Sequence, residues 1–276
     1  MSIYEELRHF LLVSKHGTFT AAAKRAHLSQ PALSASVQRL EEDMGARLLD
    51  RGRHGATLTA SGAALLPHAI AVQTALAEGR RAVAEIEGLY AGEVRLAAGA
   101  TATTYLLPKI LTRFRRKHEG IKFLMREGYA LDMRAHVESG ELDLGIVSGK
   151  GNDAWFHDEL IIVASPKIDA KKADFLTFPK GSSTRELLHK HLGEVEIVME
   201  LASIAAVKGN VRAGMGKALL SRSAVKADLR TGRLVEVRSR NTPIRRTLSL
   251  VHRGVSRLPP AAAALREAIL SSPTSR

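Results

Sequence analysis

The N-terminal fold is decided by residues 10–62, which read FLLVSKHGTFTAAAKRAHLSQPALSASVQRLEEDMGARLLDRGRHGATLTASG. Apolar residues recur at helical spacing over residues 4–15, and Gly17 then allows the chain to turn. Thr18 is a suitable N-cap for a second helix, whose alanines allow a neighbouring helix to approach closely. Residues 26–28 make the next turn. This pattern predicts two short helices that pack against each other.

A third helix is predicted to begin after Ser29, whose hydroxyl can accept hydrogen bonds from the first turn. Pro31 falls in that turn, where its missing N–H costs nothing, and Gly45 is suited to the end of the helix. The apolar face carries Leu33, Val37 and Leu40. The outer face carries Gln30, Ser34 and Gln38. Such a polar face is suited to reading base edges in the major groove, although an ordinary solvated helix would look similar.

Residues 46–59 are interpreted as two short strands around a glycine-rich turn, which is the pattern of a wing. Arg51 and Arg53 would lie where a hairpin reaches DNA phosphates or the minor groove. Solvated surface charge is the alternative explanation for both arginines. The N-terminal domain is therefore predicted to be an all-α winged helix-turn-helix.

The order and spacing of these residues resemble the N-terminal domain of the LysR-type transcriptional regulators. The resemblance rests on Phe10, Gly17-Thr18-Phe19, Ala21-Ala22, Leu28-Ser29-Gln30-Pro31-Ala32-Leu33-Ser34, Leu40-Glu41, Gly45, Leu48, Arg51, Leu58-Thr59 and Gly62. It implies DNA contacts from Ser29, Gln30, Pro31, Ser34 and Ser36, with Arg51 and Arg53 on the wing. Many members carry a larger polar residue where this chain has Ala35. Base preference is then expected from a thymine-methyl contact, DNA shape, or Gln30, Ser34, Ser36 and Gln38.

Composition describes a soluble globular protein, with 276 residues of which 45% are hydrophobic. The chain has no cysteine, which excludes disulfides, thiol redox sensing and thiolate metal sites. No membrane span is expected, because Pro67 and His68 interrupt the apolar region 63–77. A cytoplasmic location is therefore expected, and sensing through a bound small molecule stays open.

The net charge of +13 is unevenly distributed. Residues 1–90 hold ten Lys or Arg and nine Asp or Glu, so nearly all of the excess belongs to residues 91–276. Charge alone is therefore weak support for DNA binding by the N-terminal segment. A basic C-terminal region would favour an anionic ligand, or would only maintain solubility.

A long linker helix is predicted after the wing, because apolar and small residues follow alternating steps of four and three. The seam is formed by Leu65, Ala69, Val72, Leu76, Gly79, Val83, Ile86 and Tyr90. A second copy of the chain is the expected partner for this seam, with packing against its own domain as the alternative. The family resemblance also implies dimers formed through this helix, and a dimer or tetramer is expected.

Residues 91–276 alternate strands and helices, which predicts a mostly parallel α/β sheet. The resemblance implies an effector-binding domain of two subdomains, similar to periplasmic solute-binding proteins, with a cleft between them. The predicted domains are 1–60, the linker helix 61–90, and 91–276. Subdomain I would hold about 91–158 plus the C-terminal end, and subdomain II about 159–253. The chain is expected to cross near 158–162 and to return within 240–258.

Hydroxyl side chains gather at two strand-to-helix turns that would face this cleft. The first turn carries Thr101 and Thr103, and the equivalent turn of the second subdomain carries Ser182, Ser183 and Thr184. With the free N–H groups of the helix starts they would clamp a small anion such as a carboxylate or phosphate, although plain N-capping uses the same residues. Weaker candidates are Glu127, Gly128, Tyr129, Ser148 and Ser203, and Arg185 would either pair with an anion or face solvent.

Other chemistry has little support. Gly214-Met215-Gly216 lacks the third glycine of a dinucleotide fingerprint, and His189 and His191 cannot share one helix face. No cofactor, metal or catalysis is expected. The predicted function is a LysR-type transcriptional regulator that binds double-stranded promoter DNA and a small effector, with RNA polymerase as a further candidate partner. The alternative is a cytoplasmic small-molecule-binding protein whose DNA-binding domain is non-specific or vestigial.

Overall fold

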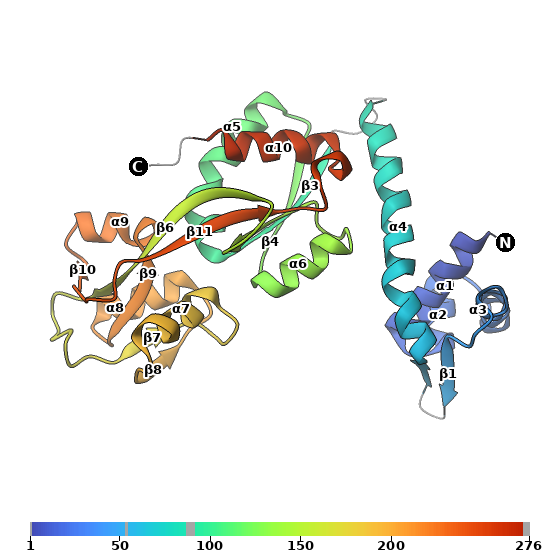
Figure 1. The fold of residues 1–276 in the computed structure, drawn as a ribbon, viewed down its shortest axis with the longest axis horizontal. Coiled ribbons are helices and arrows are strands. Elements are labelled where there is room, and N and C mark those ends of the chain that lie inside the picture. Colours follow the sequence, from blue (N-terminus) through green and yellow to red (C-terminus); the bar gives the residue numbers. More distant parts are fainter. Residues whose placement is uncertain (1, 53–54, 87–91, 273–276) are drawn as a thin grey trace. The chain divides into compact units, whose positions relative to one another are not determined.

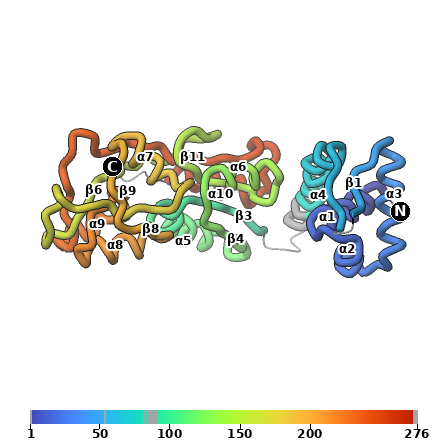
Figure 2. Tube along the Cα trace, turned by 90° about the horizontal axis from the view of Figure 1, so that it is seen from below, coloured from blue at the N-terminus to red at the C-terminus, as the bar shows by residue number. Residues whose placement is uncertain are grey.

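A computed structural model describes residues 2–52, 55–86 and 92–272 of the chain. The chain divides into two compact units, Met1–Ala84 and Glu85–Arg276, drawn in Figures 1 and 2. The first unit is a winged helix-turn-helix with a long following helix, and the second is a mixed α/β domain. Both agree with the predicted fold class.

The first unit contains the predicted three helices, the hairpin and the long helix that follows. They are α1 (Ile3–His16), α2 (Phe19–Ala26), α3 (Gln30–Met44), β1 (Leu49–Gly52), β2 (Gly55–Leu58) and α4 (Ala60–Ile86). Gly17 and Gly45 adopt left-handed backbone conformations, with φ of 69° and 65°, at the ends of α1 and α3. The Oγ1 of Thr18 accepts a hydrogen bond from the N–H of Ala21, and the Oγ of Ser29 accepts one from Ala32.

The core of this unit lies between α1, α2, α3 and the wing. Its fully buried members include Phe10, Val13, Leu33, Val37, Leu40 and Leu48. The wing is tied to this core, because the N–H of Ala56 donates to the carbonyl of Gly17 at 2.7 Å. The carboxylate of Glu41 on α3 also accepts from the N–H groups of Leu48 and Leu49, at 2.8 and 3.1 Å. The wing is therefore held at a fixed place beside α3.

Helix α4 contains Pro67 and leaves part of its apolar seam uncovered. Ala69 is buried, whereas Val72, Leu76 and Val83 are 47%, 39% and 61% exposed. The stretch Ala60–Arg80 is also long and apolar enough to span a membrane by length and composition alone, with a mean hydropathy of 1.2. The predicted long helix is present, although the seam position Tyr90 lies outside the described residues.

The second unit is built on one continuous sheet with the strand order β4-β3-β5-β11-β6-β9-β7-β8, and β10 pairs with β6. Its strands are β3 (Glu93–Ala98), β4 (Lys122–Glu127), β5 (Leu144–Ser148), β6 (Asp153–Ala164), β7 (Phe175–Thr177), β8 (Ile197–Glu200), β9 (Lys217–Ser221), β10 (Val235–Glu236) and β11 (Ile244–Val251). Its α-helices are α5 (Leu107–Lys117), α6 (Ala130–Glu138), α7 (Ser183–Leu192), α8 (Ile204–Ala213), α9 (Arg222–Arg230) and α10 (Pro260–Leu270). A π-helical turn, η1 (Ala102–Leu106), precedes α5, and a 3-10 turn, η2 (Val255–Arg257), precedes α10.

Two long strands, β6 and β11, lie in the middle of this sheet and pair antiparallel with each other. They also pair antiparallel with β9 and β5, respectively, so the sheet is mixed and not mostly parallel as predicted. β6 contains the predicted first crossing, and β11 lies within the range predicted for the return. On one side of them, β3, β4 and β5 are parallel and pack with α5 and α10 around Leu96, Leu144 and Leu265. On the other side, β7, β8 and β9 pack with α8 and α9 around Val207 and Val225. Figure 1 shows the two halves joined by β6 and β11.

Helix α9 was not predicted from the sequence. This nine-residue helix is capped by the Oγ of Ser221, which accepts from the N–H of Ser223, and it buries Ala224, Val225 and Asp228. A buried aspartate within so short a segment conceals the apolar period that marks a longer helix.

Candidate DNA-binding surface and effector cleft

Helix α3 presents most of its predicted contact residues on the outer face. Ser29, Gln30, Pro31 and Gln38 are exposed, and Ser34 is half-buried. Gln38 also donates to the carboxylate of Glu42 one turn further on, at 3.1 Å. Ala35 is exposed on the same helix and offers only a methyl group. The outer face can therefore present amide and hydroxyl groups together with one apolar contact to base edges.

Ser36 does not belong to this face, which corrects the prediction of a DNA contact. Its side chain is 0% exposed, and its Oγ lies 2.8 Å from Nδ1 of the buried His9 on α1. Two positions after Ser34, the helix has turned by about 200°. Ser36 therefore joins α3 to α1 from the inside. Burial lowers the pKa of His9 below its ordinary value, and nearby Arg8 adds to this effect.

On the wing, the guanidinium of Arg51 lies over the ring of Phe19 at 4.3 Å, while the residue stays exposed. This stacking places a positive charge near the turn of the hairpin, beside the start of α2, where it is available to a phosphate. Arg53 lies outside the described residues.

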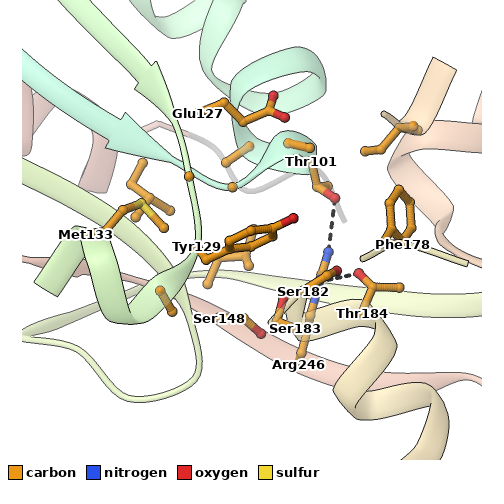
Figure 3. A pocket seen from close by; sticks show the side chains of 18 of the residues that line it. Thr101, Glu127, Tyr129, Met133, Ser148, Phe178, Ser182, Ser183, Thr184 and Arg246 are labelled. Atoms are coloured by element: carbon orange, nitrogen blue, oxygen red, sulfur yellow. Dashed lines mark hydrogen bonds between the residues drawn. The ribbon is translucent and has the colours of Figure 1, made fainter. Parts of the chain in front are cut away.

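The second unit contains a cavity of about 260 Å³ between its two halves (Figure 3). Six of the predicted effector-binding residues line it: Thr101, Tyr129, Ser148, Ser182, Ser183 and Thr184. Glu127 and Gly128 line it as well. Thr101 and Thr184 are buried, whereas Tyr129 is exposed. The cavity thus brings together hydroxyl groups that are about 80 residues apart in the sequence.

Thr103 and Ser203 are not among the lining residues, which corrects two predictions. The Oγ1 of Thr103 donates to the backbone carbonyls of Ala98 and Gly99, at 3.3 and 3.2 Å. The Oγ of Ser203 accepts from the N–H of Ala206 and caps α8. Both hydroxyls bond to local backbone groups: Ser203 acts as the N-cap of α8, whereas Thr103 donates to carbonyls of the preceding turn. Arg185 pairs with the carboxylate of Glu200 and does not line the cavity.

Arg246 on β11 was not predicted from the sequence, although its guanidinium is the centre of the site. It is 9% exposed, and its Nε and Nη2 lie 2.9 and 2.7 Å from Oδ2 of the buried Asp158 on β6. Its Nη2 donates to Thr101 at 3.0 Å, and its Nη1 donates to Thr184 and Ser183 at 3.3 and 3.5 Å. Figure 3 shows this side chain between Thr101 and Thr184.

A sequence signal for Arg246 did exist. In a strand, residues two apart share a face, so Arg246 falls on the side of the buried Ile244 and Leu248. A charged residue on the apolar face of a strand needs a buried partner and is therefore a candidate for a functional role.

The remainder of the cavity is mostly apolar. Its apolar side chains belong to Ala100, Ala102, Ala130, Met133, Ile146, Phe178, Pro179, Ala202, Ile204 and Leu248. Among the residues that the structure describes, no group of three His, Cys, Asp or Glu side chains is placed to hold a metal ion. The site is thus suited to a small organic molecule with one polar end.

Two family models match the chain and together cover nearly all of it. A model described as "Bacterial regulatory helix-turn-helix protein, lysR family" matches residues 4–63, and one described as "LysR substrate binding domain" matches residues 87–273. The chain is 29% identical to the "RuBisCO operon transcriptional regulator" of Allochromatium vinosum, over 96% of this chain and 95% of that protein. It is 30% identical to a "Probable RuBisCO transcriptional regulator" of Synechocystis, over 90% of this chain and 79% of that protein.

Solved structures share the fold over almost the whole length. A full-length OxyR variant from Pseudomonas aeruginosa aligns with a TM-score of 0.69 at 22% identity, covering 98% of this chain and 94% of that one. Full-length CbnR complexed with its target DNA aligns with a TM-score of 0.68 at 22% identity, covering 98% and 99%.

Proposed function

Because the chain belongs to the LysR family of transcriptional regulators, we propose that α3 reads a specific promoter sequence and that the cavity of the second unit receives a small effector. The observation that carries this proposal is the division of α3 into two faces. Leu33, Val37 and Leu40 are fully buried, so the helix can present Gln30 and Gln38 outward without rearrangement. Arg51 on the wing would contact a phosphate beside the groove.

The protein would act as a dimer or a larger oligomer, in the cytoplasm and without catalytic activity of its own. The exposed seam of α4, with Val72, Leu76 and Val83, provides an apolar face for a second copy. Two recognition helices would then enter major grooves about one helical turn apart or a small multiple of it. Effector binding would shift the relative placement of these helices through the linker.

The first experiment is DNA selection by the purified protein, followed by salt titration of the best fragment against a scrambled one. We expect two half-sites and an affinity at least about a thousandfold above that for scrambled DNA. Equal binding of both fragments with a steep salt dependence would mean that only phosphates are read. That result would favour the alternative, a small-molecule-binding protein whose DNA-binding domain is non-specific or vestigial. The observation that supports this alternative is the near balance of positive and negative charge in residues 1–90.

The role of α3 is tested by the double variant Gln30→Ala, Ser34→Ala. It should abolish sequence preference and leave folding and ligand binding intact, because neither side chain belongs to the core. The matched control is Gln73→Ala, which removes an exposed glutamine from α4 of the same unit. Specific binding retained by the double variant would refute the assignment of α3.

A further inference from the structure

All three guanidinium nitrogens of Arg246 contact oxygen atoms of the protein. A guanidinium has five N–H donors, one on Nε and two on each terminal nitrogen. Nε donates to Asp158, and Nη2 lies 2.7 Å from the same carboxylate oxygen and donates to Thr101. Nη1 donates to Thr184 and Ser183. Although Arg246 lines the cavity, all three of its nitrogens are therefore already held by protein oxygens.

These contacts fix the roles of three hydroxyl groups. A hydroxyl has one proton and two lone pairs, so one that accepts from Arg246 keeps its proton for another acceptor. The described residues provide no such acceptor for the protons of Thr101, Ser183 and Thr184. Because α7 begins at Ser183, its first backbone N–H groups add further donors at the same place. The ligand that completes these bonds must supply acceptor oxygens.

The charge in the cavity limits how negative that ligand can be. Arg246 is the only cation among the described residues that line the cavity, and Asp158 neutralises it. The second oxygen of Asp158 accepts from Ser221 at 2.6 Å, so this pair is complete without a ligand. Glu127 adds a negative charge to the lining, at the top of the view in Figure 3. A dianion such as a phosphate ester would meet repulsion there without a free cation to offset it.

The volume and the apolar lining of the cavity indicate the chemistry of the rest of the ligand, away from its acceptor oxygens. Its volume of about 260 Å³ is just below the roughly 300–1,000 Å³ that is typical of small-molecule sites. Met133, Phe178 and Leu248 provide apolar surface in the same cavity. A compact apolar body would gain contact area here, whereas a polyhydroxylated body would lose hydrogen bonds to water.

We propose that the effector is a compact monocarboxylate with an apolar body, whose carboxylate accepts hydrogen bonds from Thr101, Ser183 and Thr184. In this arrangement Arg246 is a positioning residue that orients the hydroxyls and does not bind the ligand itself. This inference rests on the proposed function, in which the cavity receives the effector.

The test is calorimetric titration of the full chain with probes that differ in their polar end. Benzoate and 3-methylbutyrate carry the carboxylate, benzyl alcohol and 3-methylbutanol are their neutral counterparts, and phenyl phosphate is the dianion. We expect the carboxylates to bind at least about tenfold tighter than the matched alcohols and than phenyl phosphate. An alcohol or phosphate that binds as tightly, or no carboxylate binding up to about 10 mM, overturns the proposal.

Variants then locate the contact. Thr101→Val should weaken carboxylate binding at least about tenfold and alcohol binding less, because a hydrogen bond to a charged acceptor is the stronger one. Thr103→Val is the matched control, since it removes a hydroxyl of the same turn that bonds only to backbone carbonyls. Arg246→Lys keeps a positive charge beside Asp158 but has only three donors, so it should also lower carboxylate affinity. Equal effects of Thr101→Val on the carboxylates and the alcohols would refute the contact.

Operator binding is measured in parallel, without any probe, on the same protein preparations. If specific DNA binding is present and the carboxylates show no preference, the ligand class is wrong and the regulator stands. If specific DNA binding is absent while the carboxylates bind as expected, the ligand class stands and the proposed function fails.

Discussion

Nδ1 of His9 on α1 lies 2.8 Å from Oγ of Ser36 on α3, and both side chains are buried. One turn along each helix, Arg39 of α3 donates to the carboxylate of Glu6 of α1 at 3.0 Å. Apolar packing alone tolerates small rotations of a helix, whereas a hydrogen bond requires a defined distance and angle. These two contacts therefore set the rotation of α3, and with it the direction of the side chains that face DNA.

The first prediction separates the inner and outer serines of α3. Ser36→Ala should lower the stability of the first unit by about 1–3 kcal/mol, because it leaves a ring nitrogen of His9 buried without this partner. Ser34→Ala should leave stability nearly unchanged and weaken binding to the selected operator. Hydrogen exchange of peptides from α1 and α3 in the full chain measures the stability, and operator titration measures the affinity. A Ser36→Ala protein with native exchange rates and lost operator preference would restore Ser36 as a DNA contact.

The lowered pKa of His9 makes the second prediction a pH dependence. Burial is the main cause, Arg8 and Arg39 lower this pKa further, and Glu5 and Glu6 oppose them. In the unfolded chain His9 has an ordinary pKa near 6.5, so the unfolded state binds the proton first as the pH falls. Stability of the first unit should therefore decrease below about pH 6.5, until the pH passes the lower pKa of the folded state.

This pH dependence is measured by hydrogen exchange of α1 and α3 between about pH 7.5 and about pH 5.5, after correction for intrinsic exchange rates. His9→Gln removes the titrating group and should flatten the dependence, even if it lowers stability at every pH. His27→Gln is the control, because His27 is exposed. Equal slopes for the wild-type chain and His9→Gln would show that other groups determine the acid sensitivity.

Local signals in the sequence were sufficient for the N-terminal fold. The cap at Ser29, the turn at Gly17 and the end of α3 at Gly45 each follow from one residue type in one backbone conformation. The order of the strands in the second unit depends on contacts far apart in the chain. Short elements such as α9 carry too few residues to show a period, so the sequence did not reveal them.

The residues of the candidate site that lie at strand-to-helix turns could be predicted from the sequence. Thr101 and Thr184 lie at strand-to-helix turns, and such turns line the cavity. Arg246 was missed because its role depends on Asp158, which is 88 residues away on another strand. Thr101 and Thr103 look equivalent in the sequence of this turn, but the structure joins only Thr101 to Arg246, whereas Thr103 bonds to backbone carbonyls.

The third prediction concerns the exposed seam of α4. Leu76→Glu should weaken self-association at least about tenfold, because a carboxylate would be buried between two apolar helix faces. Ala77→Glu is the control, since Ala77 is exposed on the same helix and lies outside the seam. Sedimentation equilibrium measures the dissociation constant. Equal association of both variants would place the interface elsewhere.

The fourth prediction uses two glycines to test how the wing is held. A Cβ at Gly62 would lie 2.0 Å from the carbonyl oxygen of Leu48 and 2.9 Å from its carbon, so the backbone at the start of the wing would have to move. Gly62→Ala should therefore destabilise the first unit by about 1–3 kcal/mol and weaken operator binding through displacement of Arg51. A Cβ at Gly79 would meet nothing within 4 Å in one chain, so Gly79→Ala should stabilise α4 by up to about 1 kcal/mol. Hydrogen exchange and operator titration on both variants give the comparison. If Gly62→Ala exchanges and binds like the wild type, the close approach of α4 to Leu48 is not what holds the wing in place.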